Sequence, residues 1–319
     1  MSQQSWDRVT IDAQSVDAPL SAAAIFLVVT IRPGDGPLAT VRDVLDGVND
    51  LVKTVGFRDL AARLSCIVAI GSAAWDRFDR ARRPADLRPF QPIHGPAHRA
   101  PATPGDLLFH IRAERPDLCF EFERLLLDRL GDAVEVADEV QGFRYFDARD
   151  LLGFVDGTAN PTGGDLPEAS LVGAEDPDFA GGSYVVVQKY LHDLAAWGRL
   201  TVEQQEAVIG RTKSDNVELP DDAFPRKPHK TLATIERDGE EFDILRDNMP
   251  FGRAGQGEFG TYFIGYSGRL WVTETMLQRM FLGDPPGEYD RILDFSTAVT
   301  GGTFFAPSSS TLARLAGGH

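Results

Sequence analysis

The chain has 319 residues, and its 48 acidic and 32 basic side chains give a formal charge of −16. This length suggests two domains, and a hydrophobic content of 43% gives each enough apolar mass for a core, which excludes a disordered chain. The acidity argues against a protein that neutralises nucleic-acid phosphates or coats an anionic membrane. Cys66 and Cys119 are too few for a disulfide scaffold or a thiolate zinc cluster.

The first half alternates between the hydrophobic periods of strands and helices. In chain order we expect a strand at 25–31, a helix at 38–55, a strand at 64–70, a surface loop at 83–105, a strand at 106–112, a helix at 116–130 and a strand at 133–137. This order, β-α-β-β-α-β, is the split unit that forms an antiparallel sheet with helices on one face.

The second half is a distorted copy of the same element order. We expect a strand at 183–189, one or two helices in 191–211, strands at 231–235, 244–246 and 261–266, and a helix at 271–282. A segment rich in Gly, Asp and Pro (151–180) joins the halves and is typical of a long functional loop. The sequence therefore predicts two α+β domains, at 1–150 and 151–319.

No segment of the sequence has the character of a membrane span. The most apolar early run, 22–31, is about half the roughly 20 residues that a spanning helix needs. Residues 1–7 contain neither a basic region nor a twin arginine ahead of an apolar stretch. We therefore expect a cytoplasmic protein that does not bind membranes.

A glycine-flanked aspartate lies in the joining segment, in the motif Gly153-Phe154-Val155-Asp156-Gly157-Thr158-Ala159-Asn160-Pro161. One interpretation is a tight turn in which Asp156 caps local backbone N–H groups. The other is a rigidly held carboxylate beside small glycines that let a bulky ligand approach. The motif alone leaves both open.

Six histidines are candidates for ligand or acid–base roles. His94 and His98 lie in a loop that contains Gly and Pro, so the helical two-histidine metal spacing does not apply to them. His110 lies among apolar neighbours and is expected in the core, His192 has no distinguishing context, and His319 is the last residue.

The sixth, His229, lies in the cationic run Arg226-Lys227-Pro228-His229-Lys230. A structural role is one interpretation, but a neutral imidazole is also a good axial ligand for iron. The neighbouring cations are expected to keep the free ring neutral and to receive acidic groups such as porphyrin propionates.

A cation and an amide occur close together in Leu245-Arg246-Asp247-Asn248-Met249. On an extended segment Arg246 and Asn248 point to the same face. Arg246 is either a salt-bridge partner in an acidic chain or, together with Asp156, part of a pocket. In the second case the three groups bind a small oxygen species, move its proton and stabilise charge on the departing oxygen.

Taken together, these residues resemble the dye-decolorizing peroxidase family of haem enzymes. The sequence Gly153-Phe154-Val155-Asp156-Gly157 fits the family's GxxDG motif, His229 follows Asp156 by 73 residues, and Arg246 follows His229 by 17. The ending at 295–308 is also similar to that family. The short loops and the missing export signal resemble its B-type branch.

The resemblance implies tandem ferredoxin-like domains with antiparallel sheets and one haem b per chain, held mainly by the C-terminal domain. It implies that His229 is the iron ligand, that Asp156, Arg246 and Asn248 are catalytic, and that Gly157 contacts the cofactor. Asp290 would be the partner of His229, with Asp294 as a competitor one helical turn further on. Such a carboxylate accepts the imidazole N–H and makes the ligand more electron-donating.

The activity that this resemblance implies is reduction of hydrogen peroxide through an oxoferryl intermediate, with oxidation of dyes, phenols or other aromatic donors in one-electron steps. The negative charge of the chain favours cationic donors, Mn²⁺ among them. The alternative is a haem-binding or iron-handling protein without turnover, which would use the same His229. Oxidation of bulky dyes would need electron transfer through Tyr or Trp side chains, for which Trp197, Trp271, Tyr262 and Tyr266 are candidates.

Three further expectations concern the neighbourhood of the haem and the partners. Members of the family often have a small polar residue before the proximal histidine, whereas this chain has Pro228 there. Homo-oligomerisation is expected from the resemblance. Relatives in the B-type branch are often cargo of encapsulin shells, but the chain ends shortly after 312, so we expect no targeting tail and no shell loading.

Overall fold

The computed structural model describes residues 12–317 and is dominated by one antiparallel sheet. The strands follow the order β10-β12-β7-β14-β2-β5-β1-β6, with β11 paired to β12 and β13 paired to β7. Their bounds are β1 (Ala23–Ile31), β2 (Ser65–Gly71), β5 (Leu107–Ala113), β6 (Val134–Phe143), β7 (Ser183–His192), β10 (Leu245–Arg246), β11 (Met249–Arg253), β12 (Glu258–Ser267), β13 (Ser296–Ala298) and β14 (Gly302–Ala306). Two small hairpins lie outside this sheet: β3 (Ile93–His94) with β4 (Arg99–Ala100), and β8 (Ile235–Arg237) with β9 (Glu240–Phe242).

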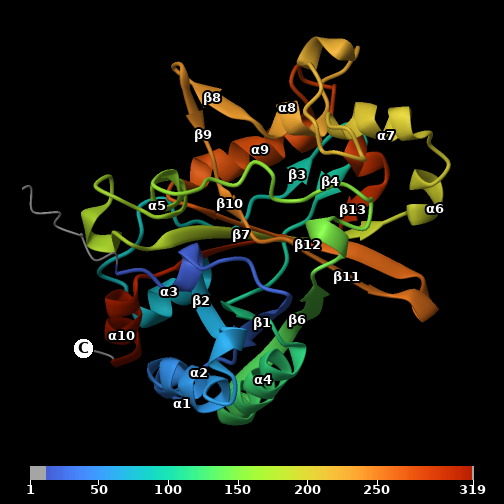
Figure 1. Ribbon diagram of the computed structural model, residues 1–319. Coiled ribbons are helices and arrows are strands. Elements are labelled where there is room, and N and C mark those ends of the chain that lie inside the picture. Colours follow the sequence, from blue (N-terminus) through green and yellow to red (C-terminus); the bar gives the residue numbers. More distant parts are fainter. Residues whose placement is uncertain (1–11, 318–319) are drawn as a thin grey trace, which may run out of the picture.

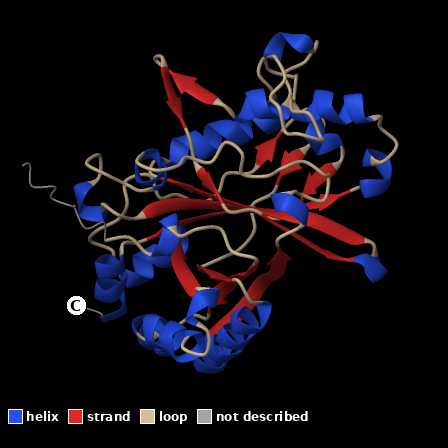
Figure 2. Ribbon diagram, viewed as in Figure 1, coloured by secondary structure: helices blue, strands red, loops and turns tan. Residues whose placement is uncertain are grey.

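The helices form two groups on either side of the strands (Figures 1 and 2). The helices are α1 (Asp35–Asp46), α2 (Val48–Gly56), α3 (Ser72–Phe78), α4 (Pro116–Leu130), α5 (Asp165–Ser170), α6 (Leu194–Trp197), α7 (Val202–Ile209), α8 (His229–Ala233), α9 (Leu270–Leu282) and α10 (Ser309–Gly317). In Figure 1, α1, α2 and α4 lie below the strands of the first half, and α7, α8 and α9 lie above those of the second. None of the helices in 12–317 has the length and apolar character needed to cross a membrane.

The first half has the expected β-α-β-β-α-β order. The helix predicted at 116–130 has those bounds in the structure. Each predicted strand starts within one or two residues of an observed strand. The predicted helix 38–55 is instead two helices, α1 and α2, which meet at Gly47. The predicted strand at 133–137 extends to Phe143, and the loop at 83–105 contains the hairpin of β3 and β4.

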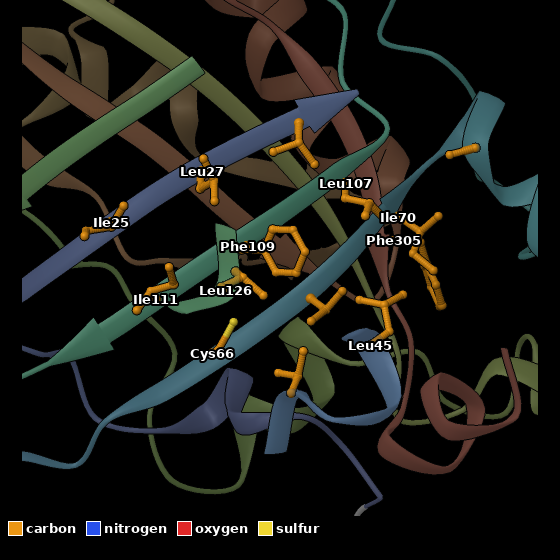
Figure 3. Packing of buried hydrophobic residues seen from close by; sticks show 14 of the residues in the cluster. Ile25, Leu27, Leu45, Cys66, Ile70, Leu107, Phe109, Ile111, Leu126 and Phe305 are labelled. Atoms are coloured by element: carbon orange, nitrogen blue, oxygen red, sulfur yellow. The ribbon is translucent and has the colours of Figure 1, made fainter. Parts of the chain in front are cut away.

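Alternating side chains of the strands serve two separate cores, because successive residues of a strand point to opposite faces. On one face, Ile25 and Leu27 of β1 pack with Phe109 of β5 against Leu45 of α1 and Leu126 of α4 (Figure 3). This core is continuous with Leu270, Leu277 and Phe281 of α9 in the second half. The apolar faces that the sequence pattern predicts are therefore buried against one another.

The sheet curls around its other face, so that strands of its two halves pack against each other there. Phe26 of β1 stacks on Tyr262 of β12, with ring centroids 4.2 Å apart, although the two strands belong to different halves. At the ends of the sheet, a Cβ on Gly142 of β6 would lie 2.5 Å from the Cβ of Met249 in β11. The sheet thus curls until its first and second halves meet, and a glycine is required at this contact.

The second half differs from expectation at one element near the site. Residues 231–235 were predicted as a strand, but α8 occupies His229–Ala233 and the strand β8 starts only at Ile235. Tertiary contacts here outweigh the β propensity of Thr231 and Thr234. The predicted strands at 244–246 and 261–266 and the helix at 271–282 correspond to β10, β12 and α9.

Candidate active site

A cavity lies in the second half, between the joining loop, α8, α9 and strands β10 and β12. It encloses an empty space of about 990 Å³, part of which is open to solvent. Most of its wall is apolar, from Leu152, Phe154, Ile209, Ile244, Phe263, Met276, Leu277, Met280 and Ile292. Its polar lining includes His229, Asp156, Arg246 and Asn248, so the structure brings four predicted site residues to one cavity.

His229 is the first residue of α8, directly after the buried Pro228. Its Nδ1 lies 2.6 Å from Oδ2 of Asp290, a side chain with no exposed surface. Because a carboxylate only accepts, Nδ1 carries the ring proton and Nε2 is left with its lone pair free for a metal. The structure thus pairs Asp290 with His229, while Asp294 contacts Tyr289 and His98 instead.

The cations beside His229 do not act as the sequence suggested. Lys227 pairs with Asp284, and Lys230 pairs with Glu218 and Asp221, so carboxylates already neutralise both charges. Burial alone would lower the pKa of His229, but the charge and hydrogen bond of Asp290 raise it above the ordinary value. Asp290, and not the neighbouring lysines that the sequence suggested, therefore governs the pKa of His229.

Asp156 lies in the joining loop, and both interpretations of its motif hold in part. Its Oδ1 accepts the N–H of Gly157 at 2.7 Å, which is the local capping predicted for a turn. Gly157 has a φ of +72°, a backbone conformation that favours glycine. The carboxylate nevertheless lines the cavity, and Gly157 lines a second, smaller hollow that also reaches Asp156, Arg246 and Asn248.

Asn248 holds the carboxylate of Asp156 in place. Its Nδ2 lies 3.1 Å from Oδ2 and 3.3 Å from Oδ1 of Asp156, and its Oδ1 accepts the N–H of Ile264 in β12 at 3.1 Å. The side-chain amide is thereby used on both sides. The amide orients the acid rather than pointing freely into the cavity.

Arg246, the last residue of β10, brings to the cavity a cation that forms no ion pair within residues 12–317. Its Nε is buried and has no hydrogen-bond partner in the part of the chain that the structure describes. Burial lowers the pKa of Arg246 from its usual value, whereas the charges of Asp156 and Asp243 act in the opposite direction. A buried donor without a partner is costly, which favours a ligand at this point.

Asn160, for which the motif suggested no role, connects the two sides of this group. Its Nδ2 donates to the carbonyl of Arg246 at 2.7 Å, and its Oδ1 accepts the Arg246 N–H at 3.0 Å. The side chain therefore pairs with Arg246 as a neighbouring strand would. This fixes the loop of Asp156 relative to β10.

Sequence reasoning also missed Asp150 and misjudged His192, which both line the cavity. Burial, reinforced by the charge of Asp156, raises the pKa of Asp150 to about 7, and its Oδ1 caps the Phe154 N–H at 3.0 Å. His192 hydrogen-bonds Ser296 and Thr261, and burial lowers its pKa to about 4. The position of Asp150 three residues before Gly153 was the only available signal.

The remaining histidines lie away from the cavity. His110 is fully buried, and its Nδ1 lies 2.7 Å from the Tyr266 hydroxyl, as expected of a core residue. His94 is exposed, and His98 contacts Asp294. His319 lies outside the described residues.

Comparison with protein families decides the relationship. The family models of the N-terminal and C-terminal parts of Dyp-type peroxidases match residues 13–144 and 147–311. The chain belongs to the Dyp-type peroxidase family. It is thus an oxidoreductase that acts on peroxide, with the α+β architecture expected from the sequence. The exact division at residue 150 stays a prediction.

Two relatives of high sequence identity agree with this. The dye-decolorizing peroxidase of Mycolicibacterium paratuberculosis is 58% identical over 93% of this chain and 84% of its own length. A variant of DypB from Rhodococcus jostii RHA1, solved in complex with heme, is 60% identical, with a TM-score of 0.91 over 92% of this chain and 96% of that one. Its likeness to DypB fits the B-type branch expected from the sequence.

A third relative is the encapsulated DyP-type peroxidase from Mycobacterium smegmatis. It is 58% identical to this chain, with a TM-score of 0.91 over 94% of this chain and 97% of that one. That relative is found in a shell. The comparison therefore does not support the expectation that this peroxidase has no shell association.

The side chains that line the cavity of this peroxidase are of the kinds that hold an iron porphyrin. Apolar walls suit the porphyrin ring, and one imidazole with a free Nε2 and a carboxylate behind it suits the iron. The buried Nε of Arg246, which has no hydrogen-bond partner in the described part of the chain, is a donor that a bound oxygen ligand would satisfy.

Proposed function

We propose that the chain is a haem-dependent peroxidase that reduces hydrogen peroxide and oxidises aromatic donors one electron at a time. The observation that carries this is the convergence on one cavity of the His229–Asp290 pair with Asp156, Arg246 and Asn248. A protein that only carries haem needs His229 and Asp290 alone. The second group is the kind of arrangement that moves a proton and stabilises charge.

In this proposal one haem b per chain is held through Nε2 of His229, and the bound iron supplies binding of peroxide and exchange of single electrons. The hydrogen bond from Nδ1 to Asp290 fixes the ring orientation and gives the ligand anionic character. The assignment of Gly157 as a cofactor contact stays a prediction. The apolar wall excludes water from the reacting oxygen atoms.

Asp156 is the proton-transfer group of the proposed reaction. Its carboxylate takes the proton from one oxygen of hydrogen peroxide and returns it to the other, so that water leaves. The hydrogen bond from Asn248 Nδ2 holds the carboxylate in one orientation during both transfers. Arg246 stabilises the negative charge on the departing oxygen.

Rapid mixing of the haem-loaded protein with peroxide tests this proposal. We expect the absorption spectrum to change to that of a more oxidised haem, about 10²–10³-fold more slowly in Asp156→Asn or Arg246→Leu. The matched control is Asp243→Asn, which removes a carboxylate near Arg246 that does not line the cavity. An unchanged spectrum in the wild-type protein would instead favour the haem-handling alternative.

Donors and partners follow from the same proposal. We propose small aromatic molecules as electron donors and Mn²⁺ as a further donor. Turnover measured with each of them tests this.

Homo-oligomerisation and a cytoplasmic location stay predictions, tested by mass measurement in solution and by cell fractionation. The relative in a shell makes co-purification with encapsulin the direct test of whether this chain is shell cargo.

A further inference from the structure

Tyr289 lies outside the cavity, but it is the neighbour in sequence of Asp290, the hydrogen-bond partner of the haem ligand. It immediately precedes Asp290, whose carboxylate bonds His229 at 2.6 Å. Tyr289 is half-buried, whereas Asp290 is fully buried. A short covalent and hydrogen-bonded path therefore runs from a partly exposed phenol ring through Asp290 to the imidazole of His229.

The phenol group of Tyr289 is hydrogen-bonded to a carboxylate. Its hydroxyl donates to Oδ1 of Asp294 at 3.0 Å, and Nε2 of His98 lies 3.0 Å from the same oxygen. His98 packs edge-on against the tyrosine ring, and the Arg226 guanidinium lies 5.0 Å from its centroid. Arg226 also donates to the backbone carbonyl of Tyr289 at 2.7 Å. These contacts hold the ring while part of it remains exposed.

No other tyrosine has this combination. Tyr184, Tyr190, Tyr262 and Tyr266 are each at most 8% exposed, and among the described residues Tyr145 has no hydrogen bond to a carboxylate. Trp197, proposed from the sequence as a carrier of electrons, is only 3% exposed. Of the sequence candidates, Trp271 alone is half-buried, and its ring packs against Phe242 and Arg237.

A phenol gives up an electron readily only when its proton leaves at the same time. A carboxylate that already accepts the O–H can take that proton without rearrangement. Asp294 is placed for this, and the second hydrogen bond from His98 orients it. Desolvation and the Asp294 hydrogen bond also raise the pKa of Tyr289, so the group remains a protonated phenol at neutral pH.

We propose that Tyr289 is the surface site at which aromatic donors too bulky for the cavity are oxidised. Tyr289 gives one electron through Asp290 and His229 to the haem that peroxide has oxidised, and its phenolic proton moves to Asp294. A phenol or dye at the surface then gives one electron to the Tyr289 radical, and the proton returns from Asp294. Each cycle thus carries one electron from donor to haem and leaves Tyr289 unchanged. This inference rests on the proposed peroxidase function.

The test locates the radical directly and measures two donors in parallel. Haem-loaded protein is treated with peroxide and a nitroso spin trap without a donor, and adducts are mapped by peptide mass spectrometry. We expect an adduct on Tyr289 in the wild-type protein, none there in Tyr289→Phe, and about tenfold less in Asp294→Asn, which retains the shape but is a poor proton acceptor. Tyr145→Phe, at another half-buried tyrosine, is the control and is expected to retain the adduct.

The kinetic arm compares a bulky dye with a small phenol that fits the cavity. In Tyr289→Phe we expect at least about tenfold lower kcat/KM for the dye and less than about twofold change for the small phenol. Unchanged dye oxidation in Tyr289→Phe, with no adduct on Tyr289 in the wild type, would overturn this proposal and leave the peroxidase function intact. A wild-type protein that oxidises neither donor would overturn both.

Discussion

Single side chains in the site are held mainly by backbone atoms of other elements. Asn248 is fixed by the N–H of Ile264, and Asn160 bonds both backbone groups of Arg246. Rigid supports of this kind matter because a misplacement of about 1 Å can cost roughly 10²-fold in rate. Asn160 touches neither the reacting atoms nor the haem ligand, so its effect is on position.

Replacing Asn160 with alanine removes both hydrogen bonds to Arg246 at once. We expect the rate of reaction with peroxide to fall about 10- to 100-fold, because Asp156 and Arg246 lose their fixed relation. Haem affinity should stay within about threefold, since His229 and Asp290 are untouched. Stopped-flow mixing and haem titration measure the two quantities. Thr158→Ala, an exposed position of the same loop, is the control, and an equal loss in both variants would contradict this role.

His229, Asp156, Arg246 and Asn248 were proposed from motif and spacing and line one cavity, whereas Asp150 and the contacts within the site were not predictable. The sequence left Asp290 and Asp294 open because it assumed that both lie on one helix face. In the structure Asp290 precedes a short 3-10 helix, Arg291–Asp294, so the two carboxylates point to different partners. Only the tertiary fold decides which of them reaches His229.

At the level of elements, the haem ligand depends on how closely α7 and α8 approach. Gly210 caps the end of α7 with a φ of +90°. A Cβ at this position would lie 2.7–2.9 Å from side-chain atoms of Lys230 and Pro228, which flank His229. The unusual Pro228 is thus accommodated by a glycine from another helix.

Gly210→Ala should displace the start of α8. We expect a loss of about 2–4 kcal/mol in the free energy of unfolding, from backbone strain and overpacking together. Haem binding should weaken as well, because His229 is the first residue of α8. The control Gly239→Ala has a similar φ of +80° but open space around it, so it should cost only about 1 kcal/mol. Urea unfolding and haem titration that show equal effects in both variants would exclude this mechanism.

The buried Glu123 of α4 makes the free energy of unfolding depend on pH in a predictable direction. It is 4% exposed, its Oε1 lacks a partner in the described part of the chain, and burial raises its pKa to about 7 from 4.5. Between these values the folded state binds more protons than the unfolded state, so the contribution of Glu123 to stability falls as pH rises.

Glu123→Gln should therefore stabilise the haem-free protein at pH 8 by about 1–3 kcal/mol and have little effect at pH 4. Thermal unfolding at the two pH values measures this. Glu121→Gln on the same helix is the control, because its half-buried carboxylate is paired with Arg124 and not isolated in the core. Destabilisation by Glu123→Gln at pH 8 would show that Glu123 is satisfied in its charged form.

Hydrophobic periodicity predicted most elements because their apolar faces are continuous, as in α4 and β1. It failed at α8, where five residues are too few for a helical pattern and Thr231 favours a strand. It also missed β11, Met249–Arg253, because the pairing of this strand with β12 leaves no hydrophobic pattern of its own in the sequence.

At the scale of the whole molecule, a buried ion pair joins the two halves. Arg112 of β5 donates to Oδ2 of Asp247 at 2.8 Å, and both side chains are at most 2% exposed. Asp247 lies between Arg246 and Asn248, so the first half supports the strand that carries both. The sequence could not predict this contact, because it joins residues 135 positions apart.

Arg112→Met should leave the Asp247 carboxyl buried and unpaired. Breaking a buried pair in this way costs about 3–5 kcal/mol, whereas an exposed pair contributes about 0–1 kcal/mol. We expect this difference between Arg112→Met and the control Arg124→Ala, whose ion pairs are exposed. Urea denaturation measures both variants, and equal costs would mean that the halves do not depend on this contact.

The most direct test of the whole account is haem titration of the His229→Ala variant, followed by its absorption spectrum. We expect the wild type to bind one haem per chain with the spectrum of imidazole-ligated iron, His229→Ala to lose that spectrum, and added imidazole to restore it. His98→Ala, outside the cavity, should behave as wild type. A His229→Ala variant with the spectrum and haem affinity of the wild type would contradict the assignment of His229 as the ligand.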